Sequence, residues 1–326
     1  MAVMGDNVAT LADVAKRLDK DGKIDKIVEM LSQTNEILND MLFMEGNLPT
    51  GHRTTIRTGL PSVAWRMLNQ GVPQSKSRTQ QITDTIGMLE AYANVDKDLA
   101  DLNGNTAEFR LSEDRAFIQA MNNEMAKTVI YGDTVKNSER FLGLAPRYST
   151  LDTSVATSEN VIDAGGTADL TSIYLVSWGA NTIHGIYPKG SKAGLKHQDL
   201  GEKTLTDSAG GEYQGYKTHY QWKCGLTVRD WRYGVRIANL DLKNISDSDF
   251  INLMIIASEK LPDENLGHPV FYMNRQARTK LRLARLNKDN VRLTFDNVEG
   301  KKVMKFDEIP VRRVDVISNE ETQVTA

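Results

Sequence analysis

The residues closest to a recognisable chemical motif lie between Gly185 and Lys192, in the sequence GIYPKGSK. A phosphate-binding loop reads GxxxxGK[ST], in which backbone N–H groups and the lysine hold phosphates and the hydroxyl group holds Mg²⁺. Gly185 and Gly190 have that spacing, but Ser191 precedes Lys192, so the ammonium and the hydroxyl exchange places. A nucleotide-binding enzyme that uses this loop is therefore only the weaker alternative, and the segment is interpreted as a glycine- and lysine-rich surface loop.

Histidine and acidic residues do not have the spacing of a metal site. The histidines never occur four residues apart, and the sequence contains no HExxH motif. Asp19 to Gly22, DKDG, resembles the start of a calcium loop, but the glycine comes too early and Met30 stands where the bidentate Glu belongs. The segment is better interpreted as a polar turn before a helix, and the histidines as structural or solvent-facing: His52, His184, His197, His219 and His268.

A single cysteine, Cys224, excludes an intramolecular disulfide framework and a zinc cluster of thiolates. No base accompanies it in the sequence, so we expect a small buried strand residue rather than a nucleophile. We thus predict no catalytic residue, no cofactor-binding residue and no metal ligand, and hence no enzyme. Neither a long apolar run nor a secretory signal pattern is present, which predicts a protein made and kept inside a cell.

One helical pattern carries a row of positive charge. Arg275, Arg278, Arg282 and Arg285 recur at helical spacing, with an apolar face formed by Met273, Ala277, Leu281 and Ala284. A solvated face with salt bridges is favoured over nucleic-acid contact, because charged stripes usually have that role and no aromatic residue is interleaved for base stacking. The net charge of −3 also argues against a polycation, although residues 275–313 hold twelve basic and five acidic residues.

The elements that position these residues begin with an amphipathic helix predicted over Ile24 to Phe43. The segment 47–51 breaks it, and Arg53 to Arg66 alternates like a strand. Gln70 to Arg78 is rich in small polar residues and predicts the exposed tip of a long loop, with a returning strand from Thr79 to Tyr92.

Further along, the strongest helix signal starts at the acidic cluster of Ser112 and ends before Gly132. Residues 149–170 predict a surface loop, Ile173 to Trp178 a strand, and residues 203–235 short strands and turns. Ser246 is the predicted N-cap of a helix that runs to Leu261.

Four segments in order, residues 137–148 (NSERFLGLAPRY), 171–201, 270–286 and 306–317, resemble those of tailed-bacteriophage major capsid proteins. The resemblance is to the Hong Kong 97-type fold, with short-tailed phages of the epsilon-fifteen kind most similar. It implies an α+β chain made of an N-terminal arm (1–47), an E-loop (48–92), a peripheral domain with the spine helix (93–170), an axial domain (171–300) and a closing strand that returns to the peripheral domain (301–326). In this family the E-loop lies on the neighbouring subunit.

The resemblance further implies a subunit that self-assembles, through pentamers and hexamers, into the icosahedral head shell around double-stranded DNA. Expected partners are the chain itself, a portal, a scaffold and a cement or decoration protein, with non-specific DNA contact and no membrane. The expected location is the virion, after assembly in the bacterial host cytoplasm. An encapsulin-like cargo shell, or a cement or tail component, is the alternative.

Two family features are not carried over. In the Hong Kong type, an E-loop lysine is cross-linked to an asparagine, but here Lys76 is the only lysine near the tip and many asparagines compete, so no isopeptide is assigned. The arm is also too short to be a cleaved scaffolding domain, which predicts an uncleaved subunit with a separate scaffold.

Overall fold

A computed structural model describes residues 35–101, 106–207, 209–263, 265–287, 293–298 and 301–326. The chain forms two compact units, and the described part of the first consists of segments 88–126 and 194–223. The second unit contains segments 35–87, 127–193 and 224–326. Residues 194–223 thus share a unit with 88–126, whereas the domain bounds expected from the sequence separate them. The names axial and peripheral remain predictions.

A sheet around β5 (Leu170–Trp178) forms the core of the second unit. Strand β5 pairs antiparallel with β9 (Gly234–Asp241) and β10 (His268–Met273), and all its residues are buried. The sheet extends through β4 (Val161–Asp163), parallel to β9, and through β13 (Ile309–Arg313), parallel to β10. Strand β12 (Lys301–Phe306) pairs antiparallel with β13, and β11 (Leu293–Val298) with β12. An uninterrupted apolar strand such as β5 is expected where both faces of a sheet are covered.

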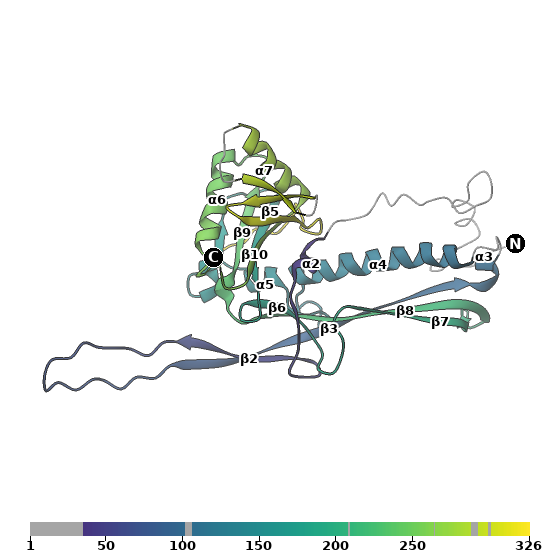
Figure 1. Ribbon diagram of the computed structural model, residues 1–326, viewed down its shortest axis with the longest axis horizontal. Coiled ribbons are helices and arrows are strands. Elements are labelled where there is room, and N and C mark those ends of the chain that lie inside the picture. Colours follow the sequence, from purple (N-terminus) through teal and green to yellow (C-terminus); the bar gives the residue numbers. More distant parts are fainter. Residues whose placement is uncertain (1–34, 102–105, 208, 264, 288–292, 299–300) are drawn as a thin grey trace. The chain divides into compact units, whose positions relative to one another are not determined.

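Two helices, α6 (Asp247–Glu259) and α7 (Arg275–Asn287), lie beside this sheet in Figure 1. Their apolar residues, including Phe250 and Met254 on α6 and Leu281 on α7, share one buried cluster with Leu175 and Phe271 of the sheet. Helix α6 begins as predicted, because the hydroxyl of Ser246 accepts a hydrogen bond from the N–H of Asp249 at 3.1 Å. Short helical turns cover 37–40 (α2), 144–147 (α5), 156–160 (η1) and 231–233 (η2).

The second unit also holds the root of a long hairpin. Strand β2 (Gly51–Gly59) pairs antiparallel with the first part of β3 (Arg78–Asp96). Nearby, β6 (Ile183–Tyr187) pairs antiparallel with the end of β8 (Glu212–Val228) and parallel with β1 (Phe43–Glu45).

The first unit is built from the second half of β3, helix α3 (Lys97–Asp101), most of helix α4 (Thr106–Tyr131), strand β7 (Leu195–Thr206) and the start of β8. Strands β7 and β8 form an antiparallel hairpin. Buried side chains of β3, α4 and β8, namely Ala93, Met121 and Tyr220, form a core cluster. Val95, Ala100 and Phe109 form another cluster.

Several sequence predictions are wrong in extent. The first part of the helix predicted over Ile24 to Phe43, up to residue 34, lies outside the described residues. The rest is helical only over Ile37–Asp40. Phe43–Glu45 is a strand instead, because it pairs with β6, where a Cβ on Gly185 would overlap Met41 and Phe43. A long-range pairing has overridden the local helical pattern.

Three other boundaries differ. Helix α4 begins at Thr106 rather than Ser112, and the Thr106 hydroxyl donates to Asp101 Oδ1 at 2.5 Å. The expected surface loop at 149–170 contains η1 and the buried strand β4, because Val161 and Ile162 pair with β9. The glycine- and lysine-rich surface loop expected at Gly185 to Lys192 lies instead at residues 188–194, between β6 and β7, because Gly185 belongs to β6.

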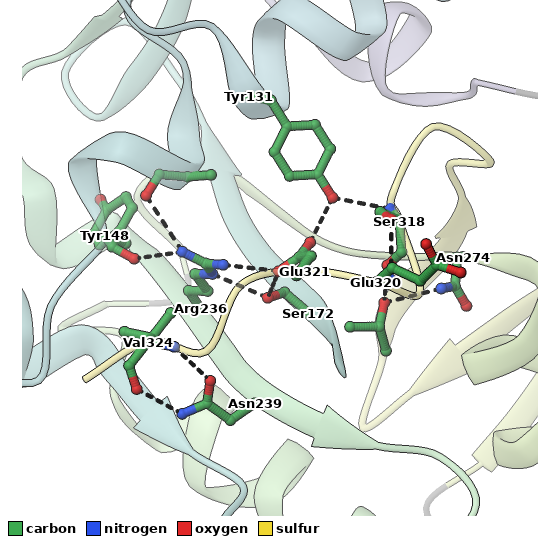
Figure 2. Close-up of polar contacts among 12 residues, drawn as sticks. Tyr131, Tyr148, Ser172, Arg236, Asn239, Asn274, Ser318, Glu320, Glu321 and Val324 are labelled. Carbon is green, nitrogen blue, oxygen red and sulfur yellow. Dashed lines mark hydrogen bonds and ion pairs between the residues drawn. The ribbon is translucent and has the colours of Figure 1, made fainter. Parts of the chain in front are cut away.

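Residues 314–325, here called the C-terminal strap, are fixed to the second unit by buried polar contacts (Figure 2). Glu321 accepts from Arg236 Nη2 at 2.8 Å and from the hydroxyl groups of Tyr131 and Ser172, each at 2.5 Å. The amide of Asn239 brackets the backbone of Val324 with two hydrogen bonds, of 2.7 and 2.8 Å. Burial raises the pKa of Tyr131, so its hydroxyl stays protonated and donates. The strap therefore joins the end of α4 to β5 and β9.

Replacing Glu321 by Ala should lower the free energy of unfolding by about 3–5 kcal/mol, because Arg236 would remain buried without its carboxylate. The two side chains are only 6% and 7% exposed. Urea denaturation of the purified chain measures this loss. The matched control is Lys243→Ala, which breaks an ion pair with Asp169 whose side chains are 75% and 54% exposed. The control should lose much less, because exposed ion pairs contribute little to stability, and equal losses in the two variants would contradict the buried role of the strap.

Candidate functional site

The tip of the hairpin, residues 60–77, is not packed against any other element in the described part of the chain. Strands β2 and β3 pair from Gly51 opposite Thr85 to Gly59 opposite Arg78, with a register shift between Arg57 and Gly59, and the chain continues between them as a long loop (Figure 1). Every residue of the tip is exposed. A hairpin of two strands has no core of its own and is at best marginally stable in water. The tip is therefore expected to gain stability from a surface that it covers.

The tip is more apolar than the sequence indicated. Trp65 is 102% exposed, Val63 92%, Leu68 91%, Leu60 81% and Met67 75%. The sequence prediction placed the tip at 70–78, where polar residues dominate, and assigned residues up to 66 to a strand. Strand β2 in fact ends at Gly59, so these apolar residues belong to the tip. Several exposed apolar side chains gathered in one short segment indicate an interaction site.

The root of the hairpin is anchored by a buried ion pair. Arg147 Nη2 lies 2.6 Å from Asp84 Oδ1 on β3, with side chains 13% and 4% exposed. The same nitrogen donates to the carbonyl oxygen of Leu226 in β8 at 3.1 Å. Arg147 belongs to the segment NSERFLGLAPRY, so that sequence motif has a mechanical role in holding the hairpin.

The apolar face predicted for the arginine-bearing helix α7 is confirmed. Met273, Ala277, Leu281 and Ala284 are all buried. Arg275 pairs with Asp315 at 3.1 Å, Arg282 is exposed, and Arg278 is half-buried. Burial lowers the pKa of Arg278, and the neighbouring Arg282, Arg313 and Arg312 lower it further, against the effect of Glu36. The side chain of Arg285 lies outside the described residues.

Strand β13 adds two arginines that the sequence pattern did not connect to the helix. Arg312 Nε lies 3.4 Å from Asp40 Oδ2, and Arg313 forms a close ion pair with Asp315. We call the combined set of Arg275, Arg278, Arg282, Arg312 and Arg313 the arginine surface. Carboxylates are interleaved with its guanidinium groups, so it is a mixed and not a purely cationic surface.

The near-motif at Gly185 to Lys192 does not have the geometry of a phosphate-binding loop. Gly185 lies inside β6, and the segment after it leads into strand β7, whereas a P-loop must lead into a helix. The N–H of Gly190, one of the groups a phosphate would need, donates to Glu45 Oε1 at 2.6 Å. Gly190 and Gly194 do have positive φ angles, of 78° and 93°, which explains glycine at these turns.

The histidines and the cysteine occupy separate environments. His52 and His184 have ring centroids 5.9 Å apart, His219 lies 3.4 Å from Glu90, His197 lies against Tyr220, and His268 is exposed. Within the described residues, no group of three or more His, Cys, Asp or Glu side chains could hold a metal ion. The segment 19–22 lies outside those residues. Cys224 is buried in β8, as predicted, and burial raises the pKa of its thiol to about 12, which disfavours the nucleophilic thiolate.

Among the described helices, none is long and apolar enough to span a membrane.

Comparison with known proteins identifies the fold and the family. A chain of the solved bacteriophage Epsilon15 structure is similar at a TM-score of 0.76 and 34% sequence identity, over 100% of both chains. The bacteriophage JBD30 capsid is similar at a TM-score of 0.53 and 11% identity, over 88% of this chain and 93% of that one, which concerns the fold alone. No protein of curated function matches the sequence significantly.

These likenesses confirm the Hong Kong 97-type capsid fold and its mixed α+β class. The sequence also matches the family described as major capsid protein GP7 over residues 19–325. With nearly the whole chain covered, this protein belongs to the GP7 family of major capsid proteins.

Proposed function

We propose that this major capsid protein assembles with copies of itself, as pentamers and hexamers, into a closed icosahedral shell around the double-stranded DNA of a tailed phage. The observation that carries the proposal is the exposed apolar tip at residues 60–77, which requires a partner surface. Contacts that join different patches of neighbouring copies close into rings, and a closed shell multiplies weak contacts through avidity.

The hairpin is the proposed E-loop, and the neighbouring copy is its proposed partner. Full burial of one large apolar side chain contributes about 1.5–3 kcal/mol, and the tip presents several of them. The same contact recurs at each copy in a shell. Helix α4 is the proposed spine helix, and the sheet around β5 with α6 and α7 is the proposed core of the axial domain.

We propose that the work of the protein is binding and not catalysis. The geometry at Gly190 supports this, because Glu45 already accepts the hydrogen bond that a nucleotide phosphate would require. The Epsilon15 likeness favours a phage head over an encapsulin-like cargo shell. Particles purified from cells that express the whole phage gene set should contain DNA, whereas a protein cargo would favour the alternative.

The remaining partners follow from the family. A portal, a scaffold and a cement or decoration protein are proposed, with assembly in the bacterial host cytoplasm and non-specific phosphate contact on the inner surface. Such contact would weaken with added salt, because bound counterions are released when cations meet phosphates.

Deleting residues 71–78 should give a folded subunit that does not form shells of normal size, because the hairpin could no longer cover its neighbour. Circular dichroism would check the fold, and negative-stain electron microscopy of the expressed chain would check assembly. Shells of normal size and stability from the deletion variant would show that the E-loop assignment is wrong.

Replacing Trp65 by Ser separates the apolar contact from the length of the hairpin. The indole is fully exposed in the subunit, so the free energy of unfolding should change by no more than about 0.5 kcal/mol. The yield of shells, measured by sedimentation, should fall strongly because a hot-spot aromatic residue is lost from the interface. The control is Lys76→Ser in the same tip, which removes a long side chain but no apolar anchor. Equal yields from the wild type and Trp65→Ser would contradict an apolar anchor.

The double variant Arg278→Ala with Arg282→Ala tests the arginine surface. We expect fewer or malformed empty shells even without DNA, because ion pairs that these arginines would form with acidic residues of neighbouring copies, worth about 0.2–1 kcal/mol each, would be lost at every copy. Lys136→Ala with Lys243→Ala, which removes two exposed charges elsewhere, is the control. Normal empty shells that lose packaged DNA more readily in salt would place the arginine surface against DNA instead.

A further inference from the structure

A pair of histidines lies at the root of the hairpin. His52 is near the start of β2 and His184 is in β6, and their rings meet edge to face at 5.9 Å and 74°. His184 is only 1% exposed, whereas His52 is partly exposed. The pair therefore bridges the hairpin and the sheet beneath it, within one compact unit.

The hydrogen bond made by His52 requires an unprotonated ring nitrogen. His52 Nδ1 accepts a hydrogen bond from the backbone N–H of Asn47 at 3.2 Å, which a protonated Nδ1 could not do. Asn47 in turn brackets Arg53 through two hydrogen bonds, of 2.7 and 2.8 Å. The turn that leads into β2 thus depends on an unprotonated His52. Neither ring nitrogen of His184 makes a hydrogen bond of good geometry among the described residues, although the backbone of Gly179 lies close enough to favour a proton slightly.

The charged groups around the pair act in opposite directions: Arg229 disfavours a proton on the rings and Asp84 favours one. Asp84, opposite His52 on β3, is held by Arg147 of α5 in the buried ion pair at 2.6 Å. Arg229, just after β8, donates to the carbonyl oxygen of Ala180 at 3.0 Å and contributes positive charge. Thr227 of β8 faces His184 across the sheet and carries no charge. Asp84, the carboxylate that acts on both histidines among the described residues, is thus already paired with an arginine.

We propose that His52 and His184 form an acid-sensitive latch, which holds the root of the β2–β3 hairpin against β6 when neutral and releases it on protonation. This goes beyond the assembly role, because it gives the subunit a means to change the attachment of its hairpin without a ligand. Release breaks the link from Asn47 to His52 and puts positive charge beside Arg229. Strand β6 joins β5 only at the pair of Trp178 and Ile183, so release of the hairpin is expected to leave β5 and β9 paired.

The direction of the pH dependence follows from the two pKa shifts. Burial, followed by His52 and Arg229, lowers the pKa of His184 from 6.5 to about 4. Burial and Arg229 also lower the pKa of His52, against the effect of Asp84. The closed root therefore binds fewer protons than the open one, so its stability is complete above the ordinary histidine pKa and declines as pH falls toward about 4. Each histidine can favour opening by up to about tenfold per pH unit in that window.

Amide hydrogen exchange of the full purified chain, at about pH 7.5 and about pH 5 and corrected for intrinsic rates, measures the latch. Peptides that cover 46–56 and 82–87 should show an opening constant at least about tenfold larger at the lower pH. Peptides from β5 and β9 should change by less than about twofold. In the double variant His52→Gln with His184→Phe the response at the root should disappear, while His268→Phe, which removes an exposed histidine, should keep it.

An opening constant at the root that is the same at both pH values overturns the latch. So does an unchanged response in the double variant, or an equal response in β5 and β9, which would indicate global acid unfolding. If the double variant does not fold, His52→Gln alone is used, since its amide oxygen can still accept a hydrogen bond. In that variant, the change in the logarithm of the opening constant between the two pH values must be at most about half of the wild-type change. A change as large as in the wild type overturns the proposal. Shells need not form in this experiment, so the latch can fail while the assembly role stands.

Discussion

The constraint on which the molecule depends is that a two-stranded hairpin cannot bury its own side chains. Its tip, with Trp65 and its apolar neighbours, is not covered by any of the residues that the structure describes. The root of the hairpin is stabilised within the subunit, because Arg147 binds both Asp84 and the backbone of β8. The subunit thus holds the root of the hairpin, while the apolar side chains of its tip stay exposed. This arrangement suits a contact made outside the chain.

Elements with a local signal could be predicted from the sequence. The buried run of β5, the N-cap of α6 and the apolar face of α7 depend on neighbours within a few residues, and all three are observed. The strand at Phe43–Glu45 could not be predicted, since its partner β6 lies far along the chain. Strand β4 (161–163) could not be predicted for the same reason, because it pairs with the distant strand β9.

The site was predicted less completely than the fold, and for a related reason. Composition placed a polar tip at 70–78, but where β2 ends decides whether Trp65 belongs to a strand or to the tip, and strand ends are set by pairing. The arginine pattern on α7 was visible because it has helical spacing. Its extension by Arg312 and Arg313 depends on β13 lying near that helix, which no local spacing reveals.

The C-terminal strap has a consequence for the timing of folding. Arg236 and Asn239 sit in the central sheet, but their partners Glu321 and Val324 are synthesised much later. A sheet that formed before residues 314–325 left the ribosome would contain a buried guanidinium with no carboxylate, and its native packing would be incomplete. The hairpin emerges from the ribosome long before that. A nascent subunit therefore presents its adhesive tip before its own core is finished, so chains made side by side risk premature association.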